Sequence, residues 1–123
     1  MVTSWVVTGA AGFLGSHVGT FLSSRTPSIG IARRETNSHL YPQTFPLDLR
    51  EFTRLEHFVH AANPPVIFHA AAIAGHETAA SDPDQAFDVN VTATRVLANA
   101  ASDIGARMIY ISTDALFSGK HGD

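Results

Sequence analysis

Three glycines near the N-terminus have the spacing of a phosphate-binding loop. Gly9 and Gly12 lie between the β-rich run 5–8 and a segment with helical periodicity that begins at Phe13, and Gly15 lies at the start of that segment. In such a loop the first glycine makes the tight turn, the second leaves room for a pyrophosphate, and the third lets the helix pack closely on the strand. The helix N-terminus then offers free N–H groups to the phosphates. No GK[ST] follows, which excludes a P-loop, and the pattern predicts dinucleotide binding.

The residue that ends the second predicted strand should select between NAD and NADP. An acid there binds the ribose 2′-hydroxyl of NAD, whereas an arginine receives the 2′-phosphate of NADP. The strand predicted at 28–32 runs into Arg33-Arg34-Glu35, and Arg33 lies nearest the expected position. NADP is therefore the favoured cofactor, with NAD as the alternative. In the competing interpretation both arginines are solvated and Glu35 is their local partner.

Alternating strands and helices are predicted to position these residues. Short apolar runs predict five strands, at 5–8, 28–32, 44–47, 66–69 and 107–111. Pro46 places the third strand at an edge of the sheet. Apolar spacing predicts a helix over 13–24, a second after Asp48 to about residue 62, and a third over 83–104. This order predicts an α/β fold, a parallel sheet with helices on both faces.

Helix ends are marked by capping residues. Asp48 and Glu51 have the spacing of a capping box. Asp82 followed by Pro83 makes an N-cap and first helical position, and Gly105 fits a C-terminal cap.

Composition excludes several classes of protein. The 123 residues indicate one domain, and 8 Lys and Arg against 11 Asp and Glu give a net charge of -3, so a nucleic-acid binder is not expected. Cysteine is absent, which removes disulfides and thiolate chemistry and fits a reducing compartment. No apolar run has the length of a membrane span and no secretory leader is visible, so no membrane partner and a cytoplasmic location are expected.

Five sequence stretches together resemble the extended short-chain dehydrogenase/reductase family. They are TGAAGFLG at 8–15, LDL at 47–49, HAAA at 69–72, DVNVTAT at 88–94 and ISTDALF at 111–117. The last, with Gly105-Ala106-Arg107 ahead of it, is most similar to the branch of dTDP-4-dehydrorhamnose reductases. The resemblance covers essentially the whole chain. It implies a Rossmann-type, doubly wound sheet with strand order 3-2-1-4-5.

The resemblance also implies roles for particular residues. The pyrophosphate would be held by the loop that comprises Gly9, Ala10, Ala11, Gly12, Phe13, Leu14 and Gly15. Asp48 and Leu49 would lie against the adenine, with the Asp48 carboxylate accepting from its exocyclic amine. Ala70, Ala71 and Ala72 would line the riboses. Asn90 would face the active site or fix the local backbone, and Thr113 would occupy the catalytic Ser/Thr position that hydrogen-bonds the substrate oxygen.

Each of these residues also has a purely structural interpretation. Asp48 could be a helix N-cap, the alanines ordinary packing, Asn90 a solvated or locally bonded helix residue, and Thr113 a turn hydroxyl. The seven histidines are scattered, with His57 and His60 on one helix face. We expect these histidines to lie on the surface or to be satisfied by hydrogen bonds, and no metal site is predicted.

The catalytic Tyr-x-x-x-Lys pair of the family is missing from these 123 residues. The single lysine is Lys120, and the residue four positions before it is Leu116, not tyrosine. The two tyrosines are Tyr41 and Tyr110, and the residues four positions after them are Phe45 and Asp114, not lysine. In the family the tyrosine exchanges the proton and the lysine lowers its pKa. We therefore expect residues 1–123 to be the NAD(P)-binding, N-terminal portion of a larger enzyme, inactive alone and without a substrate lobe.

The expected parent reaction is reduction of the keto group of a nucleotide-activated sugar. The alternatives are a sugar-nucleotide epimerase or dehydratase, and a non-catalytic dinucleotide sensor or regulatory subunit. The fifth strand would be left as an apolar edge, so homo-oligomers that pair at this edge are expected of the chain alone.

Overall fold

The computed structural model describes residues 4–33, 41–72 and 81–111. Thr113 and Arg34 lie outside these described residues, so the predicted role of Thr113 stays a prediction.

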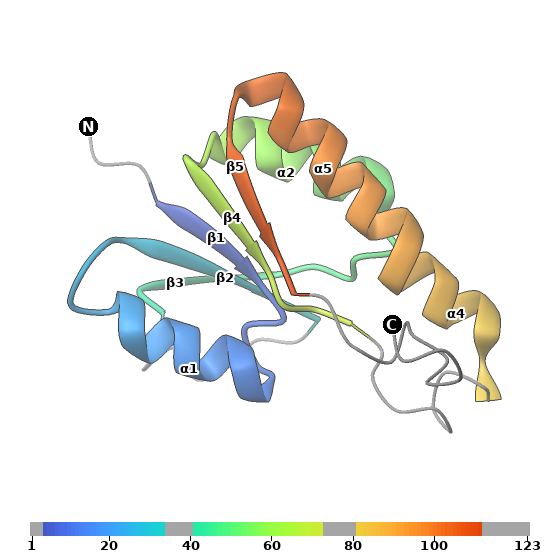
Figure 1. The fold of residues 1–123 in the computed structure, drawn as a ribbon, viewed down its shortest axis with the longest axis horizontal. Coiled ribbons are helices and arrows are strands. Elements are labelled where there is room, and N and C mark those ends of the chain that lie inside the picture. Colours follow the sequence, from blue (N-terminus) through green and yellow to red (C-terminus); the bar gives the residue numbers. More distant parts are fainter. Residues whose placement is uncertain (1–3, 34–40, 73–80, 112–123) are drawn as a thin grey trace, which may run out of the picture.

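The five predicted strands form one parallel sheet in the predicted order (Figure 1). They are β1 (Trp5–Thr8), β2 (Ser28–Ala32), β3 (Gln43–Pro46), β4 (Val66–His69) and β5 (Arg107–Tyr110), arranged β3-β2-β1-β4-β5. β3 lies one residue earlier than predicted, and β5 ends one residue sooner. The central strand β1 is covered on both faces, since Val6 and Val7 point to opposite sides and both are fully buried. Parallel strands buried on both faces explain the continuous apolar runs in the sequence.

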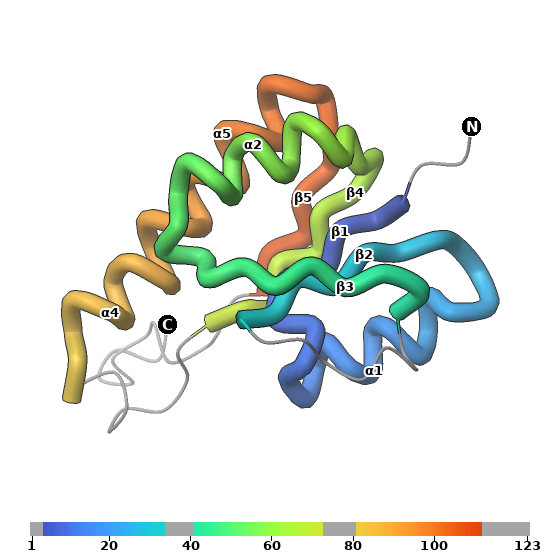
Figure 2. Tube along the Cα trace, turned by 180° about the vertical axis from the view of Figure 1, so that it is seen from behind, coloured from blue at the N-terminus to red at the C-terminus, as the bar shows by residue number. Residues whose placement is uncertain are grey.

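Helices cover both faces of the sheet, as predicted. α1 (Phe13–Leu22) lies on one face, while α2 (Phe52–Ala62) and α5 (Ala93–Ile104) pack against each other on the opposite face (Figures 1 and 2). The larger core lies under α2 and α5 and includes Leu55, Val59 and Leu97. A smaller core on the α1 side includes Leu22 and Tyr41.

The predicted capping box before α2 forms only in part. The helix begins at Phe52 rather than directly after Asp48, and its N-cap is Glu51 without a side-chain cap hydrogen bond. The Glu51 carboxylate does accept from the Asp48 backbone N–H at 3.1 Å. The Asp48 carboxylate, however, accepts from the N–H of Arg50, two residues on, because the chain there makes an Asx turn instead of a helical turn.

The third predicted helix is interrupted. It consists of α4 (Pro83–Phe87), a π-helical segment η1 (Asp88–Thr92) and then α5. Its ends are as predicted, with Asp82 accepting from the Gln85 N–H and Gly105 in the left-handed region at φ 72°. The segment DVNVT has three β-branched residues and two short polar ones, all of which weaken an α-helix interior. This weakness accounts for the wider turn.

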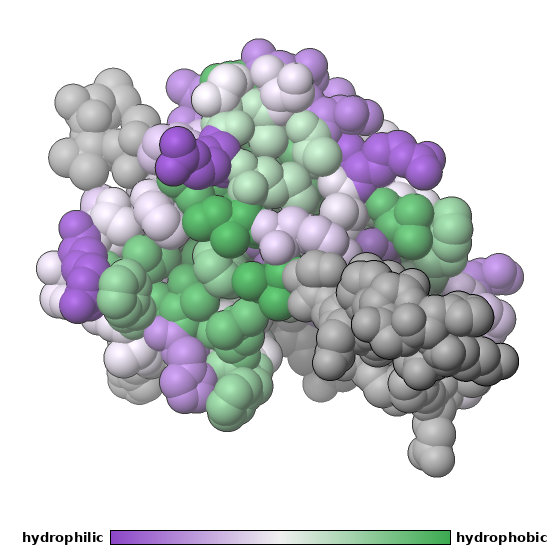
Figure 3. All heavy atoms as spheres, viewed as in Figure 1, coloured by the Kyte–Doolittle hydropathy of each residue, from purple (hydrophilic) through white to green (hydrophobic). Residues whose placement is uncertain are grey.

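Large hydrophobic side chains remain exposed at three places among the described residues. They lie on α1 (Phe13, Leu14 and Phe21), on α4 and η1 (Phe87 and Val91), and at the end of β5 (Tyr110 and Ile111). Figure 3 shows hydrophobic residues gathered in the middle of the face that Figure 1 displays. β5 is an edge strand, as predicted, and the association expected at this edge stays a prediction. No helix in the described ranges is long and apolar enough to span a membrane.

Candidate functional site

The loops that follow β1, β2, β3 and β4 surround one pocket of about 250 Å³. All four strands are parallel, so these loops meet at the carboxyl edge of the sheet, where open α/β sheets bind ligands. The pocket is lined by Gly9, Ala11, Gly12, Ile31, Ala32, Arg33, Leu47, Asp48, Leu49, Ala70, Ala71, Ala72 and Val89. Nine of the residues predicted to bind a dinucleotide therefore come together.

The glycine loop is held by close backbone contacts. Gly9 has φ +66°, and a Cβ at this residue would lie 2.8 Å from the Ala71 nitrogen. A Cβ at Gly15 would lie 1.9 Å from the Gly9 carbonyl oxygen, so this glycine sets how closely α1 approaches the loop. Gly15 does not line the pocket itself but packs against the backbone of Gly9, which does. Gly12 differs, because its Cβ would meet only the Gly9 oxygen, at 3.3 Å, and the residue faces the pocket.

The N-terminus of α1 is directed at this loop without a capping side chain. Gly12 is the N-cap residue, and no side chain accepts from the first turn. The first N–H groups of a helix, here those of Phe13, Leu14 and Gly15, have no partner within the helix. Phe13 is 85% exposed and does not belong to the pocket lining, so we expect it to contribute backbone alone.

Tyr41 holds the first turn of α1 in place through a hydrogen bond. Its hydroxyl donates to the Gly15 carbonyl, and burial raises the pKa of Tyr41 to about 12. The tyrosine is thus a structural support of α1.

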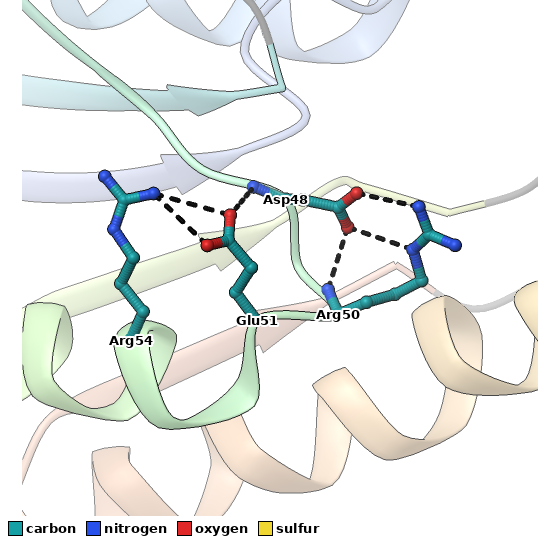
Figure 4. Close-up of polar contacts among 4 residues, drawn as sticks. All are labelled: Asp48, Arg50, Glu51 and Arg54. Carbon is teal, nitrogen blue, oxygen red and sulfur yellow. Dashed lines mark hydrogen bonds and ion pairs between the residues drawn. The ribbon is translucent and has the colours of Figure 1, made fainter.

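Asp48 lies at the polar end of the pocket in an ionised state. Its carboxylate accepts from the Arg50 backbone N–H at 2.9 Å, from Nε at 3.2 Å and from Nη2 at 2.9 Å (Figure 4). These hydrogen bonds from Arg50 lower the pKa of Asp48, and the charge of Arg33 contributes in the same direction. A carboxylate accepts about four hydrogen bonds, so the described contacts leave room for one more donor at Oδ2.

A second ion pair lies beside the first but outside the pocket. Glu51 accepts from Arg54 at 3.4 Å, and Figure 4 shows this pair on the far side of Asp48 from Arg50. Arg54 also lies over the ring of Phe45, 5.2 Å from its centroid. The two arginines thus have different neighbours, although both are exposed.

A buried chain of hydrogen bonds runs beneath the pocket and was not predicted. Thr8 and His69 are register partners at the ends of β1 and β4, and Thr8 Oγ1 lies 2.6 Å from His69 Nδ1. Ala71 N–H donates to Thr8 Oγ1 at 3.1 Å. On the other side of the ring, Nε2 lies 2.8 Å from Thr94 Oγ1, which donates to the Asn90 carbonyl at 3.0 Å.

Burial keeps His69 neutral. The side chain is 1% exposed, and desolvation lowers its pKa to about 4. Its ring also stacks on Tyr110, with centroids 5.7 Å apart. The expectation of a satisfied histidine is confirmed at this position. The sequence contained a signal for this hydrogen-bonded pair, because two polar residues, Thr8 and His69, end strands that were predicted to be neighbours.

A family comparison identifies the chain. The profile described as the RmlD substrate binding domain matches residues 3–123. The chain belongs to this family. Methionine adenosyltransferase 2 subunit beta of Rattus norvegicus is 36% identical over 117 residues, which cover 94% of this chain and 34% of that protein. dTDP-4-dehydrorhamnose reductase of Streptomyces griseus is 31% identical over 118 residues, or 96% of this chain and 36% of that enzyme.

Solved structures agree with this membership. A hypothetical dTDP-4-dehydrorhamnose reductase from Sulfolobus tokodaii has a TM-score of 0.85 and 32% identity, and the match covers 97% of this chain and 42% of that one. UDP-glucose 4-epimerase of Thermus thermophilus, in complex with NAD, has a TM-score of 0.79 and 28% identity, with coverages of 90% and 38%. The RmlD-family chain spans about a third of the length of the curated relatives it matches.

The site of this RmlD-family chain fits part of a dinucleotide. Gly12 leaves space at the helix N-terminus that a Cβ would enter, and the walls combine small residues with the buried Leu47 and Leu49. Ligand pockets measure roughly 300–1,000 Å³, and this pocket of about 250 Å³ lies just below that range. Four lining residues were not predicted, namely Ile31, Ala32, Leu47 and Val89. Their places at or just after the ends of β2 and β3 and in η1 explain why they line the pocket.

Asn90 does not belong to the described pocket lining, but it lies next to Val89, which does. Its backbone carbonyl accepts from Thr94, and the predicted role of the Asn90 side chain stays a prediction. Among the described residues, no three His, Asp or Glu side chains gather as a metal site. His60 instead pairs with Asp103 at 3.4 Å.

Proposed function

We propose that residues 1–123 form the dinucleotide-binding domain of a reductase that acts on the keto group of a nucleotide-activated sugar. One observation carries the binding role: the uncapped N-terminus of α1 and the loops after four parallel strands open into the same pocket. Relatives named dTDP-4-dehydrorhamnose reductase support the reaction class. The chain spans only part of these relatives, so the whole reaction is proposed of a longer protein.

In this proposal the pyrophosphate binds at Gly9, Ala11 and Gly12, with the backbone N–H groups of Phe13 and Leu14 as donors. The positive end of the helix dipole favours the phosphate charge there. The adenine lies against Leu49, and its exocyclic amine donates to the remaining position on the Asp48 carboxylate. Ala70, Ala71 and Ala72 line the riboses, where small side chains let the cofactor approach the backbone. When bound, NADPH supplies the hydride that reduces the keto group.

Arg33 is proposed to favour NADP over NAD. It is an exposed residue directly after β2 and lines the pocket, where a 2′-phosphate would meet its guanidinium. Structures of relatives contain NAD, for example UDP-glucose 4-epimerase, so NAD is the alternative cofactor.

Proton transfer requires residues beyond those that the pocket brings together. Thr113 is proposed to hydrogen-bond the substrate oxygen, and the proton would come from a tyrosine that the 123 residues do not provide. We therefore expect no turnover of a keto-sugar nucleotide by the chain alone, with either cofactor.

A second candidate function is a regulatory subunit that binds a dinucleotide without catalysis. It is favoured by the 36% identity to a protein named as the beta subunit of methionine adenosyltransferase 2. An epimerase is the alternative enzyme, favoured by the UDP-glucose 4-epimerase structures. A Tyr-x-x-x-Lys pair downstream of Thr113 in the same reading frame would favour an enzyme, and its absence would favour the subunit.

Isothermal titration calorimetry with NADPH and NADH tests the binding role. Wild-type chain should bind NADPH, whereas Gly12→Ala should lose binding because the new Cβ enters the phosphate space. Gly105→Ala is the control: Gly105 does not line the pocket, and a Cβ there meets no atom within 4 Å. Because φ of +72° at this C-cap disfavours alanine, the control should lose some stability but keep the cofactor affinity of wild type. The proposal fails if neither dinucleotide binds to wild-type chain, or if Gly12→Ala binds as tightly as Gly105→Ala does.

A further inference from the structure

The buried hydrogen-bond chain through His69 has only one consistent arrangement of protons. The Asn90 carbonyl can only accept, so the single hydroxyl hydrogen of Thr94 goes to it, and Thr94 Oγ1 must accept from His69 Nε2–H. The neutral ring then carries its proton on Nε2, and Nδ1 is an acceptor. Thr8 Oγ1 therefore donates to Nδ1 and accepts from the Ala71 N–H. Every donor in the chain finds an acceptor.

The two ends of this chain lie in different walls of the pocket. Ala71 lies in the wall after β4, and its backbone is also the surface on which Gly9 rests. Asn90 lies in η1, next to Val89 of the opposite wall. The imidazole is therefore a rigid connection between the wall under the glycine loop and the wall formed by the π-turn.

We propose that His69 is a positioning residue of the dinucleotide pocket, whose neutral ring fixes the Ala71 backbone and the Asn90 carbonyl relative to each other. The proposal deepens the proposed function and rests on it for the effect on cofactor affinity. The connection itself does not depend on which ligand binds. The ring touches no ligand and takes no part in the reaction.

Among the described residues, the contacts of the ring include no charge that would compensate an imidazolium. Tyr110 from β5 is the titratable side chain that stacks on the ring, and Thr8 and Thr94 are its hydrogen-bond partners from β1 and α5. The hydrogen bonds of the ring among these contacts are both with hydroxyl groups, which favours a fixed tautomer and a fixed position of the ring.

Nuclear magnetic resonance of the ¹⁵N-labelled chain tests the connection without a cofactor. The two ring nitrogens of His69 should show the Nε2–H tautomer in wild-type chain. An Nδ1–H tautomer, or exchange between both, would overturn the proposal.

Two variants, each of which keeps a polar group in place of one ring nitrogen, separate the two sides of the ring. Asn places an acceptor as many bonds from Cα as Nδ1, and Gln places an N–H as many bonds away as Nε2. His69→Asn should therefore shift the backbone amides of η1 and spare Ala71, whereas His69→Gln should shift Gly9 and Ala71 and spare η1. A residue that only fills space would give the same pattern in both variants, and that result would contradict the proposal.

Cofactor affinity completes the test. Each variant loses one buried hydrogen bond, and we expect about tenfold weaker NADPH binding by calorimetry. His57→Asn is the matched control, an exposed histidine on α2, and should bind as wild type does. If the His69 variants do not fold, Thr94→Val should weaken binding and Thr94→Ser should restore it. Equal affinity in all variants would overturn the positioning role, whereas absence of binding by wild-type chain would refute the proposed function alone.

Discussion

Acid should destabilise the protein through His69 in a pH range where carboxylates are still ionised. The folded-state pKa of about 4 lies below the ordinary value of 6.5, so the unfolded chain takes up the proton more readily. The contribution of the neutral ring to stability is thus complete above pH 6.5. It is lost as the pH falls, and the loss is complete below pH 4.

The size of this effect follows from the difference between the two pKa values. A shift of one pKa unit corresponds to about 1.4 kcal/mol, so the full loss is about 3 kcal/mol. About 2 kcal/mol of this should be lost between pH 7 and pH 5, since the unfolded state is almost fully protonated at pH 5. A buried imidazolium would also leave the Thr8 hydroxyl without its acceptor.

Urea denaturation of wild-type chain and His69→Gln at pH 7, 6 and 5 measures this loss. The difference between the two free energies of unfolding isolates the ring, because all other groups titrate in both proteins. The pH dependence contributed by His60 has the opposite sign, because the hydrogen bond to the Glu56 carbonyl raises the pKa of His60 and its stabilisation is lost as the pH rises. This contribution is the same in both proteins and cancels in the difference. Parallel pH profiles for the two proteins would refute the reasoning.

Three further substitutions test other parts of the structure. Arg33→Glu should weaken NADPH binding more than NADH binding in calorimetry, and equal weakening would contradict the 2′-phosphate role. Arg107→Glu is the control, at the amino end of β5, and should change the affinity for neither dinucleotide. Gly15→Ala should destabilise the fold by about 3 kcal/mol or more in urea, because its Cβ meets the Gly9 oxygen at 1.9 Å, and a loss below about 0.5 kcal/mol would contradict this contact. Ser28→Ala should be neutral or stabilising by up to about 1 kcal/mol, since the buried Ser28 hydroxyl has no hydrogen-bond partner among the described residues, and clear destabilisation would show that a partner exists.

The sheet could be predicted because its signals are local. The run around Val6 and Val7 is apolar on both faces, the glycines end it, and Asp82 and Gly105 mark the helix ends by their own backbone preferences. The pocket followed from the sheet, because parallel strands bring Gly12 and Asp48 to one edge although 36 residues separate them.

Other features depend on contacts that one sequence does not display. Asp48 and Glu51 had the spacing of a capping box, but Arg50 competes for the Asp48 carboxylate and delays the helix. His69 was one of seven histidines, and although the predicted order already placed β1 beside β4, the register that sets Thr8 opposite His69 comes from the structure. The π-turn depends on a small balance of helix propensities, which periodicity alone does not reveal.

The π-turn sets the position of one pocket wall through the extra residue that it holds between α4 and α5. Each residue of an α-helix turns the chain by about 100°. Deleting one residue from 88–92 would allow a regular α-helix and would leave α4 and α5 facing as they do now, because a π-turn holds one residue more than an α-helical turn. Substitutions that convert the segment into a regular α-helix without a deletion would instead rotate α4 relative to α5 by up to about that angle and carry Val89 away from the pocket. Substitutions that straighten this segment, more than the deletion of one residue, would therefore separate relatives that keep the pocket from relatives that have lost it.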